Sequence, residues 1–213
     1  MKIDTLAIHA AEDKTAGSGN NATGSRGAVV APIHLSTTYE RDEEGNFSSG
    51  YMYTRHGNPN RGALERCLAA LEGGEEAACF ASGSAAAMAV FQALQPGDHV
   101  IVPKDMYMGI QHMIRQVLTR WQLDFSFVNM DRLEDYLRPE TRLIWIETPS
   151  NPMMKVTSIP RIVELARRRK IITVVDNTFA TPVFQRPLEL GVDLVMHSTT
   201  KYFGGHSDVL GGA

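Results

Sequence analysis

Two apolar segments of the sequence are followed at once by residues that could do chemistry. Residues 171–175 lead into Asp176, and residues 194–196 lead into Ser198, Thr200 and Lys201. An acid at the end of a buried strand is costly unless it is paired. A lysine at a neighbouring strand end is costly unless it is neutral, paired or covalently engaged. A plain salt bridge between Asp176 and Lys201 is one solution to both problems.

A turn of small residues favours another solution. Residues 81–84, Ala-Ser-Gly-Ser, lie between an apolar run and an apolar helix predicted over 84–94. Such a turn offers backbone N–H groups and a positive helix end to an anion such as phosphate, although a tight strand–helix turn also needs small residues for its own geometry. A carboxylate, an amine and a phosphate site together fit pyridoxal phosphate, whose ring nitrogen, aldehyde and phosphate need these partners. We therefore predict this cofactor.

The elements that must position these residues alternate along the chain. Short apolar runs at 77–80, 100–102, 143–146, 171–175 and 194–196 predict strands, several of them without polar alternation, as in parallel strands covered on both faces. Residues 123–128 do alternate, which favours a strand nearer an edge. Helices are predicted between strands, as at 84–94 and 159–169. The sequence thus predicts an α/β fold with a mainly parallel sheet flanked by helices, and ligands bind beyond the carboxyl ends of such strands.

The first 50 residues differ in composition from the rest of the chain. Residues 17–27 and 42–50 are polar and rich in small residues, with a short extended piece at 31–35 between them. We predict an N-terminal arm over 1–50 and a cofactor-binding domain over 51–213. A helix is expected from Asn58-Pro59, which supplies an N-cap and a proline at the first helical position, to Gly73-Gly74.

Composition excludes several classes of partner. The chain has 213 residues and a formal charge of −3, which does not suggest a nucleic acid or an anionic membrane as partner.

Two cysteines cannot form a disulfide framework, and neither lies in a C-x-x-C pair, so we expect a cytoplasmic protein without a metal site. No signal peptide or membrane span is expected. A nicotinamide-binding domain is disfavoured because no G-x-G-x-x-G follows the first strands.

Five blocks of sequence, in order, resemble the Cys/Met-metabolism (trans-sulfuration) family of pyridoxal-phosphate enzymes. They are residues 51–59, 82–84, 147–152, 174–182 and 197–208, and the likeness runs from about residue 32 to the last residue. It implies the large domain of a fold type I (aspartate-aminotransferase-like) enzyme. It also implies that relatives continue into a C-terminal domain, which supplies the arginine that binds the substrate carboxylate, so that this chain alone would turn over substrate poorly.

The resemblance assigns three catalytic roles. Lys201 would hold the cofactor covalently and later move protons on the substrate's carbons. Asp176 would keep the pyridine nitrogen protonated, so that the ring remains an electron sink. Tyr107 stands where the family has a tyrosine that stacks on the ring and takes part in proton transfer. Its alternative reading is an ordinary aromatic residue at a helix start.

Further roles concern binding of the cofactor. The resemblance implies phosphate contacts from two backbone N–H groups and two hydroxyls, and ring contacts from two further residues. These are Gly83 and Ser84 (N–H), Ser198 and Thr200 (hydroxyl), Asn151 (toward the ring's 3-oxygen) and Thr178 (on the same face).

The resemblance also implies an active site that is shared between two subunits. Tyr53 and Arg55 resemble a pair that reaches the phosphate of a neighbouring subunit, and an arginine suits phosphate because it can donate two parallel hydrogen bonds. The resemblance therefore predicts a homo-oligomer, a dimer with shared active sites and a tetramer as a dimer of dimers.

The reaction is expected to be γ-replacement or β/γ-elimination on a small-molecule substrate, a sulfur amino acid or an O-acylhomoserine. Residues 197–212 most resemble cystathionine γ-synthases and γ-lyases, with O-acylhomoserine sulfhydrylase and methionine γ-lyase as alternatives. Tyr107-Met108-Gly109 lacks the Tyr-Gly-Cys run typical of methionine γ-lyases. A hypothesis of another class is a truncated, non-catalytic relative that still binds pyridoxal phosphate.

Overall fold

The computed structural model describes residues 2–11 and 30–213, which belong to two compact units, Met1–Ala78 and Cys79–Ala213. The boundary between these units lies further along the chain than residue 50, where we predicted the end of an N-terminal arm. The division into an arm over 1–50 and a domain over 51–213 stays a prediction. The polar segment 17–27 lies outside the described residues.

Helix α2 (Pro59–Glu72) is the main element of the first unit, and it begins and ends where the sequence predicts. The side chain of Asn58 accepts hydrogen bonds from the N–H groups of Asn60 and Arg61, and Pro59 occupies the first turn. Gly73 ends the helix in the left-handed conformation, with φ of 74°. Local capping residues therefore set both ends of this helix.

The chain before α2 has little core of its own. Helix α1 (Ile3–His9), which the sequence did not predict, contains no buried residue. The extended piece at 31–35 is held by Asn60 of α2, which accepts a hydrogen bond from the N–H of His34 and donates one to the carbonyl of Pro32. These two hydrogen bonds attach the extended piece to the first turn of α2.

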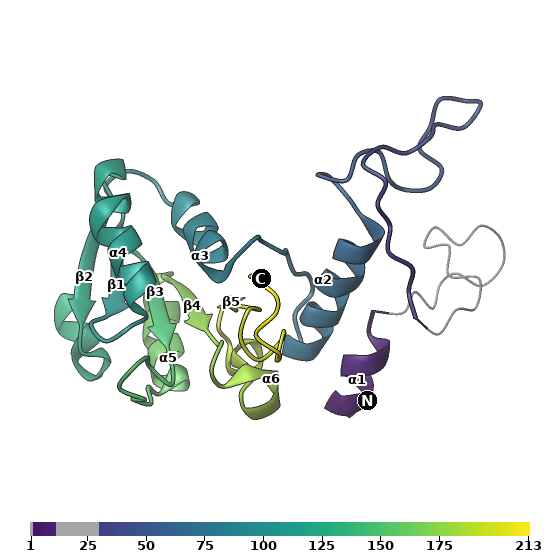
Figure 1. The fold of residues 1–213 in the computed structure, drawn as a ribbon. Coiled ribbons are helices and arrows are strands. Elements are labelled where there is room, and N and C mark those ends of the chain that lie inside the picture. The colour runs from purple at the N-terminus through teal and green to yellow at the C-terminus, as the bar shows by residue number, and fades with distance from the viewer. Residues whose placement is uncertain (1, 12–29) are drawn as a thin grey trace. The chain divides into compact units, whose positions relative to one another are not determined.

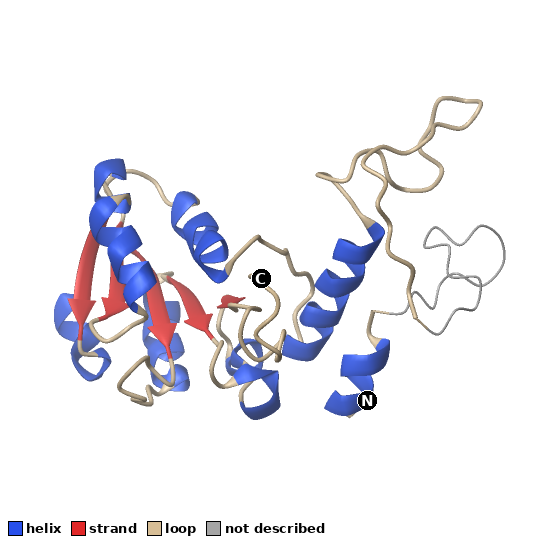
Figure 2. Ribbon diagram, in the orientation of Figure 1, coloured by secondary structure: helices blue, strands red, loops and turns tan. Residues whose placement is uncertain are grey.

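The second unit is built around a five-stranded sheet in which every neighbouring pair is parallel, in the order β2-β1-β3-β4-β5 (Figures 1 and 2). Its elements along the chain are α3 (Gly83–Gln92), β1 (His99–Pro103), α4 (Met108–Gln116), η1 (Leu118–Trp121), β2 (Asp124–Val128), η2 (Met130–Tyr136), β3 (Thr141–Glu147), α5 (Ile159–Arg169), β4 (Ile172–Asp176), α6 (Thr181–Phe184), η3 (Pro187–Leu190) and β5 (Leu194–Met196).

Both faces of the sheet are covered, because successive side chains of a strand point to opposite sides. Val100 and Val102 belong to a core cluster that includes residues of α3 and α4, whereas Ile101 between them belongs to a second cluster with residues of α5. Trp145 is fully buried in the first cluster, stacked on Phe91 of α3 at 5.2 Å between ring centroids. The α/β class with a parallel sheet flanked by helices is confirmed.

Most of the predicted strands are present, and one is wrong. The runs at 100–102, 143–146, 171–175 and 194–196 correspond to β1, β3, β4 and β5, and the alternating segment forms the edge strand β2. The run at 77–80 is not a strand of this sheet. Only Phe80 pairs, in an isolated antiparallel bridge to Gly212. Apolar composition alone does not distinguish this run, whose residues 77–80 are only partly buried or exposed, from the strands of the sheet.

The helices of the described residues, 2–11 and 30–213, are all too short or too polar to cross a membrane.

Candidate active site

A cavity of about 210 Å³ lies in the unit Cys79–Ala213, lined by residues that follow the carboxyl ends of its strands. Every predicted site residue that belongs to this unit lines it: Gly83, Ser84, Tyr107, Asn151, Asp176, Thr178, Ser198, Thr200 and Lys201. In open parallel sheets this edge is where ligands bind, since the loops that leave the strands converge there.

Asp176 and Lys201 line this cavity as opposite charges that do not pair. Asp176 ends β4 with 8% of its surface exposed, and its Oδ1 accepts a hydrogen bond from the N–H of Thr178 at 3.1 Å. Burial raises the pKa of Asp176 above its ordinary value, because the charged form has lost water. Lys201 is exposed, and within the described chain its amine makes no hydrogen bond or ion pair. The plain salt bridge allowed by the sequence is therefore not present.

The small-residue turn lies directly against the segment that carries the lysine. Ser82 caps α3, its hydroxyl accepting a hydrogen bond from the N–H of Ala85, and Gly83 begins the helix. A Cβ atom on Gly83 would lie 2.7 Å from the Cβ and 2.9 Å from the Cα of Ser198. Only glycine permits this approach, which places the free N–H groups of the first turn of α3 beside Ser198.

A hydrogen-bonded chain joins the acid to the lysine segment. The Thr178 hydroxyl oxygen accepts the N–H of Ser198 at 2.8 Å, and the N–H of Thr178 is held by Asp176. The Ser198 hydroxyl has no partner within the described residues, so it can donate to a ligand. The Thr200 hydroxyl donates to the carbonyl of Gly211 at 3.2 Å, so its predicted bond to phosphate requires its proton to turn away from Gly211.

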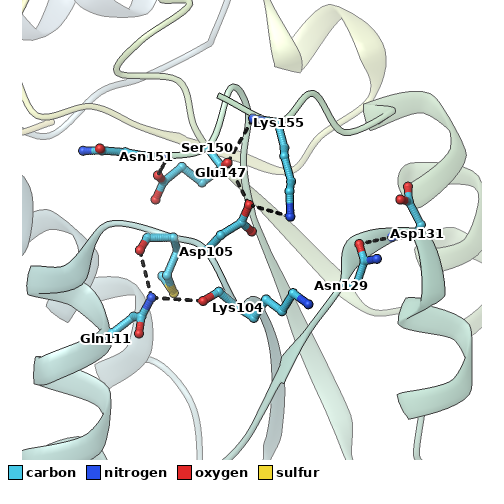
Figure 3. Close-up of polar contacts among 10 residues, drawn as sticks. Lys104, Asp105, Gln111, Asn129, Asp131, Glu147, Ser150, Asn151 and Lys155 are labelled. Atoms are coloured by element: carbon cyan, nitrogen blue, oxygen red, sulfur yellow. Dashed lines mark hydrogen bonds and ion pairs between the residues drawn. The ribbon is translucent and has the colours of Figure 1, made fainter. Parts of the chain in front are cut away.

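Tyr107 and Asn151 form another wall of the cavity. Tyr107 precedes α4 and leaves 46% of its surface exposed. A Cβ atom on Gly109 would lie 2.5 Å from the Tyr107 ring, so the absence of a side chain there makes room for the ring. Asn151 lies on the loop after β3, close to Glu147 in Figure 3.

Glu147 lines the same cavity, although the sequence analysis assigned it no role. It ends β3 in register with Asp176 of β4, and only 5% of its surface is exposed. Burial and the neighbouring Asp176 carboxylate raise the pKa of Glu147 to about 7. The same rule that selected Asp176, an acid directly after a buried apolar run, would have selected Glu147.

Tyr53 and Arg55 belong to the first unit, Met1–Ala78. The Arg55 guanidinium lies 4.9 Å from the centroid of the Tyr53 ring, so the two side chains form a pair. Their predicted role at a phosphate stays a prediction.

The donors around the cavity fit pyridoxal phosphate. No group of three or more His, Cys, Asp or Glu side chains suited to a metal occurs in residues 2–11 and 30–213. A buried carboxylate that forms no ion pair with a lysine or arginine of the described residues suits a protonated pyridine nitrogen, and an unpaired lysine suits an aldehyde. The N-terminus of α3 with the free Ser198 hydroxyl suits a phosphate.

Comparisons with known proteins decide the family. The family model described as Cys/Met metabolism PLP-dependent enzyme matches residues 5–213. The chain belongs to this family. It is 46% identical over 213 residues to cystathionine γ-synthase of Mycobacterium tuberculosis (strain H37Rv) and 44% identical over 214 residues to cystathionine β-lyase of Coxiella burnetii. These alignments cover 98% and 99% of this chain and 53% of each relative.

A solved structure agrees with this assignment. The crystal structure of cystathionine γ-lyase from Lactobacillus plantarum, complexed with L-serine, matches with a TM-score of 0.90 and 40% identity. The match covers all of this chain and 54% of that one, so the chain spans about half the length of the relatives it matches. The predicted family, fold type and cofactor are confirmed, and the nicotinamide alternative is excluded.

Proposed function

We propose that this chain forms the cofactor-binding part of an enzyme that acts on cystathionine or a related amino acid by γ-replacement or β/γ-elimination. The observation that carries the proposal is the convergence of Lys201, Asp176 and Tyr107 on one cavity from three different strand ends. A family fold alone would not require these three chemical groups to face one small space.

Each of the three residues has one task in the proposed reaction. When bound, pyridoxal phosphate supplies an electron sink that makes the hydrogens on a substrate's α-carbon acidic. Asp176 would keep the proton on the ring nitrogen, because burial makes its charge costly and a pyridinium would offset that cost. Lys201 would hold the cofactor and would take and return protons at the substrate's carbons. Tyr107 would cover the ring and assist proton transfer.

Anchoring of the phosphate is proposed for the turn at the start of α3. Gly83, Ser84, Ser198 and Thr200 all line the cavity, so the N–H groups of the first two and the hydroxyls of the last two are available to a phosphate. Asn151 and Thr178 would contact the ring from the loops after β3 and β4. The contact of Gly83 with Ser198 supports this assignment, since it brings both sets of donors to one place.

We favour cystathionine as substrate of an elimination or as product of a γ-replacement on an O-acylhomoserine, since the relatives named above are a cystathionine γ-synthase, β-lyase and γ-lyase. They are 40–46% identical to this chain, so overall similarity does not separate replacement from elimination. We keep γ-synthase and γ-lyase as the leading activities, because residues 197–212 resemble these enzymes. O-acylhomoserine sulfhydrylase and methionine γ-lyase are the alternatives, and non-catalytic binding of the cofactor is the alternative of another class.

The assembly is proposed to be a homo-oligomer with shared sites. The pairing of Arg55 with Tyr53 supports a joint role in binding the phosphate of a neighbouring subunit. We place the protein in the cytoplasm, since neither Cys67 nor Cys79 forms a disulfide, as is usual in a reducing compartment.

Product analysis tests the reaction. The chain, loaded with pyridoxal phosphate, is incubated with cystathionine and assayed for 2-oxobutanoate and pyruvate, the products of γ- and β-elimination. It is also incubated with cysteine and an O-acylhomoserine and assayed for cystathionine. Because this chain alone is expected to turn over substrate poorly, a small yield of one of these products is expected, and none from Lys201→Ala. Cofactor bound at Lys201 with no product, even after the chain is extended by the C-terminal part of a relative, would favour the non-catalytic alternative.

A further inference from the structure

Glu147 holds two separate loops of the cavity with a single carboxylate. Its Oε2 accepts the N–H of Tyr107 at 2.8 Å, and its Oε1 accepts the N–H of Asn151 at 2.7 Å. Tyr107 lies on the connection between β1 and α4, 40 residues earlier in the chain than Glu147. Each oxygen therefore fixes the backbone of one residue to which the proposed function gives a cofactor contact.

A second tie between the same loops does not reach these two residues. The hydroxyl of Ser150 donates to Asp105 at 3.0 Å, and Lys155 pairs with the same carboxylate at 3.5 Å (Figure 3). This cluster joins the loops one or two residues away from Tyr107 and Asn151. Of the described side chains, Glu147 is the one that bonds to the backbone N–H of both.

Burying an ionised carboxylate at this position costs folding free energy, and this cost argues against a purely structural role for Glu147. Glu147 is buried beside Asp176, and no lysine or arginine forms an ion pair with it within the described residues. A buried group without a charge could pack at the end of β3 at lower cost. What a carboxylate adds is two acceptor oxygens in a fixed relation, which a neutral amide cannot offer.

We propose that Glu147 is the residue that positions Tyr107 and Asn151 against the cofactor. This inference rests on the proposed function. Glu147 would not touch the cofactor itself; it would act by holding the backbone of Tyr107 and Asn151, two residues that do. Protonation or amidation of Glu147 would remove one of the two acceptors, and would thereby release one of the two loops.

Amide hydrogen exchange followed by NMR tests the proposal on the full 213-residue chain without cofactor. At pH 8, where Glu147 is ionised, the amides of Tyr107 and Asn151 are expected to exchange about tenfold faster or more in Glu147→Gln than in the wild type, since a bond to a charged acceptor is lost or weakened. The amides of Ile144 and Ile146 in β3 should keep their protection. Two controls are matched: Ser150→Ala removes the neighbouring tie, and Glu164→Gln removes an exposed carboxylate of α5.

Cofactor affinity is measured on the same variants by fluorescence titration with pyridoxal phosphate. Glu147→Gln should bind about tenfold more weakly than the wild type, and Glu164→Gln should bind equally well. Unchanged exchange at Tyr107 and Asn151, faster exchange throughout β3, or faster exchange with unchanged affinity would each overturn the proposal. A wild type that binds no pyridoxal phosphate would instead refute the proposed function, while the exchange rates would still show whether Glu147 holds the two loops.

Discussion

Gly83 touches the backbone of Ser198 so closely that a Cβ atom on the glycine would lie 2.9 Å from the Cα of the serine. The contact joins the first turn of α3 to the segment after β5, two parts of the chain more than a hundred residues apart. It brings the N–H groups of the turn and the Ser198 hydroxyl to one end of the cavity. The absence of a side chain at residue 83 is thus a requirement of the proposed phosphate site.

Gly83→Ala should therefore damage both folding and binding. The added methyl group must separate the turn from Ser198, and we expect a loss of about 1–3 kcal/mol in the free energy of unfolding, as for other overpacked sites. Affinity for pyridoxal phosphate should fall about tenfold or more. Gly62→Ala in α2 is the control, because its Cβ would meet only the end of Arg66 at 3.4 Å and alanine favours a helix. Equal behaviour of the two variants would contradict the argument.

Gly109→Ala should disturb the cofactor site with little effect on stability. The new Cβ would lie 2.5 Å from the ring of Tyr107, which is partly exposed and can rotate away. We expect weaker binding of pyridoxal phosphate, by roughly three- to tenfold, from the loss of an aromatic contact of about 0.5–1.5 kcal/mol. Titration and thermal unfolding measure the two effects. A large fall in melting temperature with unchanged affinity would show that Tyr107 serves the fold and not the cofactor.

Asp176→Asn should have opposite effects on stability and on binding. Burial raises the pKa of Asp176, which means that its charge costs folding free energy as long as no cation is bound. Without cofactor, the asparagine variant should unfold at a higher temperature than the wild type at pH 8. With cofactor, its affinity should be at least about tenfold lower, since a charge-assisted bond is lost. A variant that is less stable without cofactor would show that another group already compensates this charge.

Glu147 gives the chain a predicted pH dependence. Its pKa is raised from 4.5 to about 7 by burial and by Asp176, so between these pH values the folded state binds more protons than the unfolded state. The contribution to stability is fully present below pH 4.5 and is lost as the pH rises through 7. The free energy of unfolding of the wild type, minus that of Glu147→Gln, should fall by up to about 3 kcal/mol between pH 5 and pH 8.

Urea unfolding of the cofactor-free chain, followed by tryptophan fluorescence, measures this difference, because Trp145 is fully buried in the core of the sheet. Glu164→Gln again serves as the control, since its exposed carboxylate should give a difference that does not vary with pH. A difference between wild type and Glu147→Gln that stays constant from pH 5 to pH 8, or that rises, would show that Glu147 keeps an ordinary pKa.

Sequence patterns sufficed where local chemistry decides structure. Asn58, Pro59 and Gly73 set the ends of α2, and uninterrupted apolar runs indicated four of the five strands. The order of the strands and their parallel arrangement brought together Asp176, Ser198 and Lys201, as the rule for strand ends predicts.

Sequence patterns do not indicate contacts between distant parts of the chain. The bridge of Phe80 to Gly212 depends on a partner 132 residues away, and nothing in the run 77–80 indicates it. Glu147 bonds to the backbone N–H groups of Tyr107 and Asn151, and because nearly every residue type has such a group, the sequence does not indicate which ones it contacts. Side-chain types identified the residues that would meet the cofactor, whereas the groups that hold those residues in place required the structure.

Chemical trapping of the cofactor tests the central claim most directly. The chain is mixed with pyridoxal phosphate, reduced with borohydride, digested and analysed by mass spectrometry. We predict a visible absorbance band before reduction and a pyridoxyl group on Lys201 afterwards, with none on the exposed lysines Lys104, Lys155 and Lys170, and no band in Lys201→Ala. A label spread evenly over the exposed lysines, or a band that persists in Lys201→Ala, would contradict the assignment of this cavity as a pyridoxal-phosphate site.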